Sequence, residues 1–259
     1  MSLRACRRAV VLALTLAVCV AHQWLIRLRG PLTPQRRGFW LRSSGRRLVA
    51  ALGIHCKVQG EAPLHGLVVA NHLSYLDIMF LGANVPCCIV SKQEISRWPF
   101  FGMFARMGAT IFIDRSSRVS AAAAARTIGE RLRLGVPVLL FPEGTSSDGS
   151  QVLPFYPTLF EPAVAAGIPV TAASVRYVLE GGGKERDLCW FDDTLFLPHI
   201  WKALAARGFF AEVSFGEPRV YPDRRAAAAA TRAEVIAMRA GLDPRQPAPA
   251  DPAEAVLME

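Results

Sequence analysis

Two titratable side chains, His72 and Asp77, lie in the seam between two hydrophobic segments of the stretch VVANHLSYLDIMF, residues 68–80. A carboxylate five residues after an imidazole, across a turn into a helix, can reach back to one ring nitrogen. It then fixes the tautomer and leaves the other nitrogen as a general base. Two simpler interpretations stay open. In them, His72 is a hydrogen-bonded core histidine, and Asp77 closes a capping box with Ser74 at a helix start.

A second group of polar residues lies in FPEGTSSDG, residues 141–149, directly after a hydrophobic run that is typical of a buried strand. Gly144, Thr145 and Ser146 form a natural turn, whose backbone N–H groups and hydroxyls can receive an anion. Glu143 stands beside this turn, and a carboxylate rarely follows a buried strand without a partner or a task. The turn is therefore a candidate site for the polar part of a substrate.

Arg115 ends a third hydrophobic run, GATIFIDR, residues 108–115. Its guanidinium can hold a phosphate or a carboxylate through two parallel hydrogen bonds. Ligands bind at the carboxyl ends of strands in parallel α/β sheets. His72, Glu143 and Arg115 all follow predicted strands, so we expect them at one edge of a sheet.

The elements that must position these residues alternate along the chain, which predicts an α/β domain with a mostly parallel central sheet and flanking helices. The predicted strands are 65–71, 87–92, 109–115, 136–144, 168–178 and 209–220. Helical composition marks residues 117–135, which end at Gly135, and residues 223–241, with Asp223 as the N-cap. The tail, residues 242–259, is rich in Pro, and we expect it to be disordered.

The N-terminal segment is first apolar and then basic. Residues 9–26 contain no Asp, Glu, Lys or Arg, a length at the short limit for a membrane-spanning helix. Seven Arg follow before residue 48, and such charge opposes export, which argues against a cleaved signal peptide. We expect this segment either to span a membrane or to lie in its interface, with Trp24 and Trp40 at headgroup depth.

The distribution of charge and of metal-binding residues narrows the function further. Residues 1–60 contain ten Arg, Lys57 and no acidic residue, whereas the other 199 residues contain 19 basic and 21 acidic side chains. This placement predicts contact with an anionic membrane leaflet and argues against a nucleic-acid-binding surface on the folded domain. The six Cys form no CxxC pair, the five His are scattered, and GxSxG is absent. We therefore expect no metal site, no disulfide framework and no serine hydrolase.

The stretch WPFFGMF, residues 98–104, is bulky and apolar on all sides, which is rare for a core helix. It is either a segment that faces a membrane or an acyl chain, or it is plain core packing.

The ordered set of these motifs resembles the glycerolipid acyltransferases, the group of the lysophosphatidate acyltransferases. NHLSYLD matches the N-H-x4-D block of that family, GATIFIDR its second block, FPEGTSS its third and IPVTAAS, loosely, its fourth. SKQEISRWPFFGMFARMG, between the first two blocks, also fits. The resemblance covers roughly residues 40–220, and it implies the α/β fold of that family behind an N-terminal membrane-associated helical segment.

The resemblance also implies a role for each site residue. His72 is the general base that takes the proton from a lysolipid hydroxyl, and Asp77 orients and stabilises His72. The residues that bind the polar head of the acceptor are Arg115, Glu143, Gly144, Thr145 and, as a lesser candidate, Lys92. The hydroxyl attacks the thioester of acyl-CoA or acyl-carrier protein, no acyl-enzyme forms, and no bound cofactor or metal is implied.

Ser146 departs from the family pattern. Phosphatidate-forming members usually carry an Arg there that helps to hold the acceptor phosphate, and Thr171-Ala172-Ala173 stand where a second Pro is common. Two kinds of acceptor therefore stay open. The first, on family frequency, is 1-acylglycerol-3-phosphate, which gives phosphatidate; the second is lyso-ornithine lipid, whose headgroup is an amino acid, or another lysolipid that does not give phosphatidate. The alternative of a different class is a non-catalytic membrane-associated protein, with His72 in the core and Asp77 as a cap.

The predicted organisation has three parts: a membrane anchor and basic segment (1–45), an acyltransferase domain (46–241) and the disordered tail (242–259). The expected location is the inner cell membrane, with the catalytic domain facing the cytoplasm. Membrane lipids are the expected partners, acyl-carrier protein is a further candidate partner, and no nucleic acid is expected.

Overall fold

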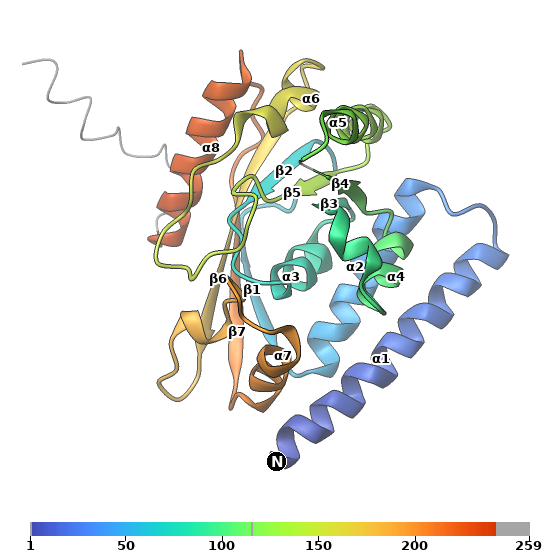
Figure 1. The fold of residues 1–259 in the computed structure, drawn as a ribbon, viewed down its shortest axis with the longest axis vertical. Helices are drawn as coiled ribbons and strands as arrows, with labels where there is room; N and C mark the ends of the chain where they lie inside the picture. Colours follow the sequence, from blue (N-terminus) through green and yellow to red (C-terminus); the bar gives the residue numbers. More distant parts are fainter. Residues whose placement is uncertain (1, 115, 242–259) are drawn as a thin grey trace, which may run out of the picture.

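A seven-stranded sheet forms the centre of the computed structural model, which describes residues 2–114 and 116–241 (Figure 1). The strands are β1 (His55–Gln59), β2 (Leu67–Ala70), β3 (Cys88–Lys92), β4 (Ile111–Ile113), β5 (Val138–Leu140), β6 (Val170–Leu179) and β7 (Phe209–Phe215). Their order across the sheet is β1-β7-β6-β2-β5-β3-β4, and every neighbouring pair is parallel except β6 and β7. The expectation of a mostly parallel sheet is confirmed.

Helices flank the sheet on both faces (Figure 1). The α-helices are α1 (Leu3–Leu28), α2 (Pro34–Ala51), α3 (Leu76–Asn84), α4 (Phe101–Met107), α5 (Arg118–Arg133), α6 (Glu161–Val164), α7 (Phe196–Ala205) and α8 (Arg224–Arg239), and the 3₁₀ helices are η1 (Gln93–Arg97), η2 (Pro157–Phe160) and η3 (Glu185–Leu188). One core cluster joins the sheet to α3 and α7, with α2 packed against it, and the other joins it to α5, α6 and α8.

The predicted strands and helices are all present, and the additional elements have weak local signals. Ser117 caps α5 by accepting a hydrogen bond from the Ser120 N–H, and Asp223 caps α8. Strand β1 has four exposed residues out of five and lies at the edge of the sheet, paired with β7, so it lacks the apolar run that marks a buried strand. Helices α2 and α7 and the antiparallel course of β7 were likewise not predicted. The predicted tail lies outside the described residues.

Helix α1 lies along the outside of the domain, against α2 and α7, and polar bonds join it to three other helices (Figure 1). Arg8 donates to the carbonyl of Ala206 at the end of α7 (2.7 Å), and Gln23 donates to the carbonyl of Met107 at the end of α4 (2.7 Å). The indole N–H of Trp40, in α2, donates to the carbonyl of Cys19 (2.8 Å). These bonds at both ends and in the middle dock α1 on the domain along its whole length.

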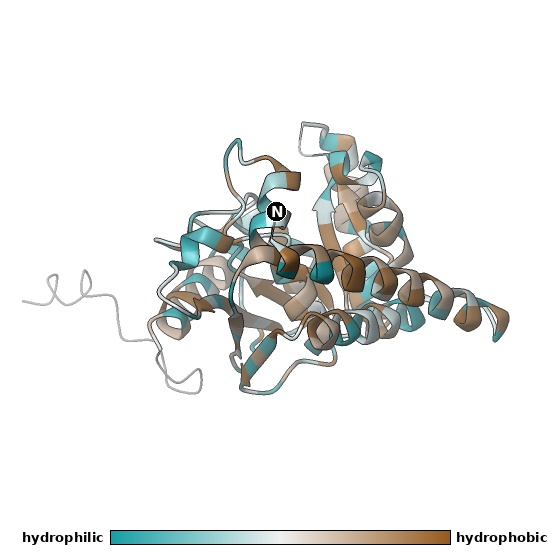
Figure 2. Ribbon diagram, turned by 90° about the horizontal axis from the view of Figure 1, so that it is seen from below, coloured by the Kyte–Doolittle hydropathy of each residue, from teal (hydrophilic) through white to brown (hydrophobic). Residues whose placement is uncertain are grey.

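The outward face of α1 is apolar. Its exposed large hydrophobic side chains are Leu3, Val10, Leu14, Val18, Trp24, Leu25 and Leu28. Most are separated by three, four or seven residues, which places them on one side of a helix. In Figure 2 the helix that begins at the N marker is hydrophobic along most of its length. By length and composition α1 could cross a membrane, and only 11% of its most apolar window is buried.

The aromatic stretch at residues 98–104 is not plain core packing. Phe100, Phe101 and Met103 are all exposed, Phe100 at 76%. Trp98 and Phe101 instead pack edge-on against Phe196 of α7. The interpretation that this stretch faces a membrane or an acyl chain is the one that the exposure favours.

Candidate active site

Strand β2 delivers Asn71 and His72 to the carboxyl edge of the sheet. All four residues of β2 are buried, and β2 lies between β5 and β6 in parallel register. The Asn71 amide donates to the carbonyl of Val175 on β6 (3.0 Å) and accepts from the Val175 N–H (2.9 Å). Through these two bonds the side chain of Asn71 extends the pairing of β2 with β6 by one residue. The bonds therefore fix the backbone just before His72.

The backbone of His72 is held from the neighbouring segment 141–149. Its N–H donates to Oε1 of Glu143 (3.0 Å), and its carbonyl accepts from the N–H of Ser147 (2.9 Å). The imidazole stacks on the ring of Phe141, with centroids 4.0 Å apart. The structure thus brings together His72 and Glu143, which the sequence predicted at one edge.

Asp77 combines the two roles that the sequence left as alternatives. Its Oδ2 accepts from Nδ1 of His72 (2.7 Å) and also from the backbone N–H groups of Leu73 (2.7 Å) and Ser74 (3.0 Å). Its Oδ1 accepts from the hydroxyl of Tyr177. The carboxylate is fully buried, so it closes the turn before α3 and orients the imidazole with the same oxygen.

The remaining ring nitrogen of His72 is available for chemistry. Among the described residues Nε2 has no hydrogen-bond partner, and the side chain is 20% exposed. A carboxylate that accepts from Nδ1 selects the tautomer with the proton on Nδ1, so Nε2 carries the free electron pair. The pair has the geometry of a general base and its orienting group.

Glu143 is buried beside His72 and ties two loops together. Its Oε2 accepts from the N–H of Leu153 (3.3 Å), while Oε1 holds His72. Burial raises the pKa of Glu143 from 4.5 to about 7, although both N–H donors act in the opposite direction. Through Oε1, Glu143 holds the backbone of His72. Its predicted part in binding the polar head of the acceptor stays a prediction.

The turn after Glu143 lies beside these residues. Gly144 has φ +75°, a left-handed conformation that suits a residue without a Cβ, and Thr145 is exposed. The hydroxyl of Ser146 donates to the carbonyl of Trp190, whose own N–H donates to the carbonyl of Leu73 (2.8 Å). Ser146 therefore joins the turn to the chain next to His72.

Of the two predicted cationic residues, the structure describes Lys92 but not Arg115. Lys92 is exposed at the carboxyl end of β3, and no hydrogen bond or ion pair joins it to the His72 cluster within the described residues. Arg115 lies outside the described residues, directly after Asp114. No group of three or more His, Cys, Asp or Glu side chains that could hold a metal occurs in residues 2–114 and 116–241.

The sequence did not point to Tyr177 or to the role of Asn71. Strand β6 has ten residues and extends past the end of β2, so its later residues face the loop that carries His72 and Asp77. The buried pattern of β6 is readable in the chain, but the partner of Tyr177 lies 100 residues earlier. The one local signal was a Tyr within a mostly apolar strand, since a buried Tyr hydroxyl needs a partner.

Comparisons with known proteins indicate the family of the chain. A family model described as Acyltransferase matches residues 55–176. A lyso-ornithine lipid O-acyltransferase of Rhodobacter capsulatus is 40% identical over 206 residues, which are 76% of this chain and 73% of that protein. A 1-acyl-sn-glycerol-3-phosphate acyltransferase of Neisseria meningitidis is 36% identical over 186 residues, which are 70% and 72% of the two chains.

A solved structure has the same fold. The 1-acyl-sn-glycerophosphate (LPA) acyltransferase of Thermotoga maritima superposes with a TM-score of 0.68 and covers 94% of this chain and 96% of its own, at 21% identity.

Proposed function

The chain belongs to the acyltransferase family, and we propose that this O-acyltransferase moves a fatty acyl group from an acyl thioester to the free hydroxyl of a lysolipid, with His72 as the general base. The observation that carries the proposal is the 2.7 Å contact between Nδ1 of His72 and the buried carboxylate of Asp77. It leaves Nε2 as a base at the carboxyl edge of the sheet. Membership in an enzyme family leaves the non-catalytic alternative without support.

In the proposed reaction Nε2 of His72 takes the proton of the lysolipid hydroxyl while the hydroxyl oxygen attacks the thioester carbonyl. A carbon–oxygen bond forms and the carbon–sulfur bond breaks. The thiolate leaves and receives the proton from the imidazolium, so the products are a diacyl lipid and a free thiol. Asp77 stabilises the imidazolium in between. No acyl-enzyme and no bound cofactor are needed, because a thioester is already an acylating group, supplied as acyl-CoA or acyl-carrier protein.

The first proposed acceptor is 1-acyl-sn-glycerol-3-phosphate, which would give phosphatidate. Arg115, at the end of the second family block, is the proposed cation for its phosphate, with Gly144 and Thr145 supplying backbone and hydroxyl donors and Lys92 as a lesser candidate. A relative that is 36% identical carries this activity in its name.

The second proposed acceptor is lyso-ornithine lipid, and Ser146 favours it. The hydroxyl of Ser146 is committed to the carbonyl of Trp190, and no cation stands at this position. A zwitterionic amino-acid headgroup needs fewer cations than a phosphate monoester. The relative that is 40% identical over 76% of this chain is named for this acceptor.

We propose that the outward face of α1 lies in lipid, which keeps the site at the membrane where lysolipids reside. The exposed apolar side chains of α1, with Leu197 on the neighbouring helix α7, Leu195 directly before α7 and Phe100 directly before α4, support this placement. The basic residues 1–60 would contact anionic headgroups. Retention of this charge favours the cytoplasmic side of the inner membrane.

The proposed function is tested by acyl transfer with the purified chain in detergent. Lysophosphatidate and lyso-ornithine lipid are offered side by side, each with acyl-CoA and with acyl-carrier protein, and His72→Ala is the inactive control. Turnover of lysophosphatidate would mean that Arg115 and the Gly144 turn suffice for a phosphate. Turnover of lyso-ornithine lipid alone would mean that Ser146 marks a changed headgroup site, and Ser146→Arg should then raise turnover of lysophosphatidate. If the chain turns over neither acceptor, the proposal is contradicted.

A further inference from the structure

Among residues 2–114 and 116–241, Tyr177 is the one side chain that bonds to the oxygen of Asp77 that His72 does not use. Its hydroxyl donates to Oδ1, while Oδ2 accepts from Nδ1 of His72. Both Tyr177 and Asp77 are buried, at 2% and 0% exposure, so water does not compete for this bond. Within the described residues, Oδ1 receives no other hydrogen bond.

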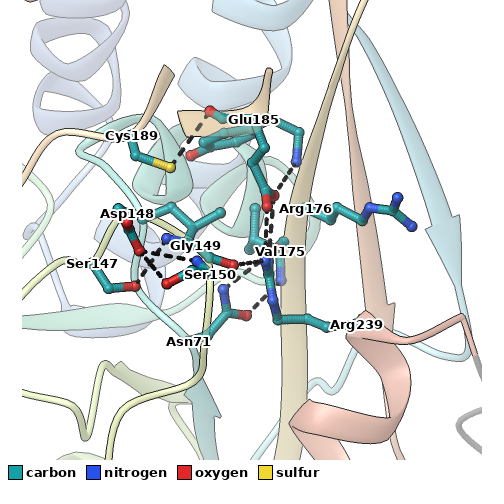
Figure 3. A network of polar contacts seen from close by, with 12 residues as sticks. Asn71, Ser147, Asp148, Gly149, Ser150, Val175, Arg176, Glu185, Cys189 and Arg239 are labelled. Carbon is teal, nitrogen blue, oxygen red and sulfur yellow. Dashed lines mark hydrogen bonds and ion pairs between the residues drawn. The ribbon is translucent and has the colours of Figure 1, made fainter. Parts of the chain in front are cut away.

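The position of Tyr177 is itself set by an ion pair from the far end of the chain. The N–H of Tyr177 donates to Oε1 of Glu185 (2.9 Å), and Oε2 of Glu185 pairs with Arg239 of α8 (2.8 Å). Arg239 also donates to the carbonyl of Val175 (2.6 Å), and the backbone of Val175 is hydrogen-bonded to the Asn71 side chain. Figure 3 shows Arg239, Glu185, Val175 and Asn71 in this network.

These contacts form one continuous path from Arg239 through Glu185, Tyr177 and Asp77 to His72. The path joins α8, η3, β6 and α3, which are far apart in sequence. Burial first, and then the charge of Asp77, raises the pKa of Tyr177 well above its ordinary value. The hydroxyl therefore keeps its proton and acts as a donor at every pH where the enzyme would work.

We propose that Tyr177 is a positioning residue of the acyl transfer, which holds Asp77 through its hydroxyl so that Asp77 presents one oxygen to His72. This inference rests on the proposed function, because it requires His72 to be the base. A carboxylate that accepts a second strong donor is pinned in one rotamer and shares its negative charge with that donor. Without the Tyr177 hydroxyl, the Asp77 carboxylate acts on His72 with more negative charge and is held less firmly in its rotamer.

The sign of the expected pH effect follows from this charge. A more negative Asp77 favours the protonated imidazole, which cannot act as a base, so the acid limb of kcat/KM moves to higher pH. The other titratable and charged groups that face this pair are Glu143 from the end of β5, Cys189 after η3, Glu185 in η3 and Arg239 in α8. None of them is altered by the substitution Tyr177→Phe.

The test measures the pH profile of kcat/KM for Tyr177→Phe in the full chain, with the lysolipid and acyl donor that the wild-type enzyme turns over. Phe keeps the ring that packs near Phe80 and Phe209. We expect kcat to fall about tenfold, as for the loss of a hydrogen bond to a charged group, and the acid limb to rise by about half a pH unit or more. Tyr75→Phe is the matched control, because its hydroxyl bonds to His199 (3.0 Å). It should leave the acid limb in place.

A second measurement keeps the test decisive if Tyr177→Phe does not fold. Site-specific replacement of Tyr177 by 3-fluorotyrosine preserves shape and strengthens the donor, so the acid limb should move to lower pH. An unchanged acid limb in both chains overturns the role of Tyr177. If His72→Ala retains activity, the proposed function fails first; if His72→Ala is inactive while Tyr177→Phe matches the wild type, only the present inference fails.

Discussion

The loop around Asp77 and the outward face of α1 depart in opposite ways from the usual distribution of polarity in a protein. At Asp77 a carboxylate with no exposed surface accepts hydrogen bonds from His72, Leu73, Ser74 and Tyr177. On α1, large apolar side chains such as Leu14 (63%) and Leu25 (55%) are exposed. One region buries charge with all its partners in place, and the other exposes apolar groups with none.

The difference shows what each region requires from its surroundings. A buried carboxylate is tolerated only if the fold itself supplies the donors, so the Asp77 region is complete within the chain. An exposed apolar stripe is tolerated only if something outside the chain covers it, and for the α1 region we propose that this cover is lipid. An enzyme that brings a lipid to a polar catalytic group needs both conditions on one molecule.

The largest expected effect is on catalysis at His72. We expect His72→Ala to lower kcat by at least about 100-fold, since positioned general bases contribute about 10²- to 10⁴-fold. The backbone bonds of His72 to Glu143 and Ser147 remain, so the melting temperature should change little. Steady-state kinetics and a thermal melt check both statements, with the exposed His65→Ala as control. Wild-type turnover in His72→Ala would remove the base from the mechanism.

The next effect combines rate and stability at Asp77. Asn offers one oxygen and one N–H₂ group where the carboxylate meets four donors, so Asp77→Asn turns an acceptor into a donor against them. We expect kcat to fall about 100-fold and the free energy of unfolding to fall by on the order of 3 kcal/mol. Kinetics and urea unfolding test this, with the exposed Asp193→Asn beside it. A loss of rate at unchanged stability would show that the backbone donors contribute nothing.

Glu143 predicts a pH dependence of stability. Burial raises its pKa from 4.5 to about 7, so between these values the folded chain binds more protons than the unfolded chain. Its contribution to the free energy of unfolding is therefore most favourable below about pH 4.5 and declines as pH rises to about 7, by on the order of 3 kcal/mol. Glu143→Gln should remove this slope in urea unfolding at a series of pH values. The exposed Glu161→Gln should keep it, and equal slopes in all three chains would refute the assignment.

The smallest effect concerns the outward face of α1. Replacing Leu14 and Val18 together by Gln removes apolar area that we place in lipid, and we expect partitioning to anionic vesicles to fall by about tenfold. Vesicle sedimentation measures this. Val119→Gln is the matched control, since Val119 is 81% exposed on α5. Equal binding of the Leu14→Gln and Val18→Gln double variant and the wild type would place this face outside the membrane.

Local sequence patterns predicted much of the scaffold. Apolar runs of strand length located β2 to β7, and caps such as Ser117 and Asp223 located the starts of α5 and α8. These signals are local because side-chain periodicity and capping depend on residues a few positions apart. Strand β1 was not predicted because an exposed edge strand has no apolar run. The antiparallel course of β7 was not predicted because strand direction is a property of the whole sheet.

The candidate site divides along the same line. Asp77 was readable as either a cap or an orienting group because both depend on the spacing from Ser74 and His72. In the structure one carboxylate serves both, through contacts within this same turn. That Glu143 holds the His72 backbone, by contrast, depends on β2 and β5 being neighbours in register. Tyr177 became part of the site because β6 lies on the other side of β2 and extends beyond it.

The sequence by itself determined the residue types of the site, their places at strand ends and the apolar, basic character of the N-terminal segment. Only the tertiary structure decided which side chains meet: Asp77 with Tyr177 across 100 residues, Glu185 with Arg239 across 54, and α1 with the ends of α4 and α7. The physical reason is that periodicity and capping are set over a few neighbouring residues, whereas a buried hydrogen bond requires strand order, register and helix packing to be established together.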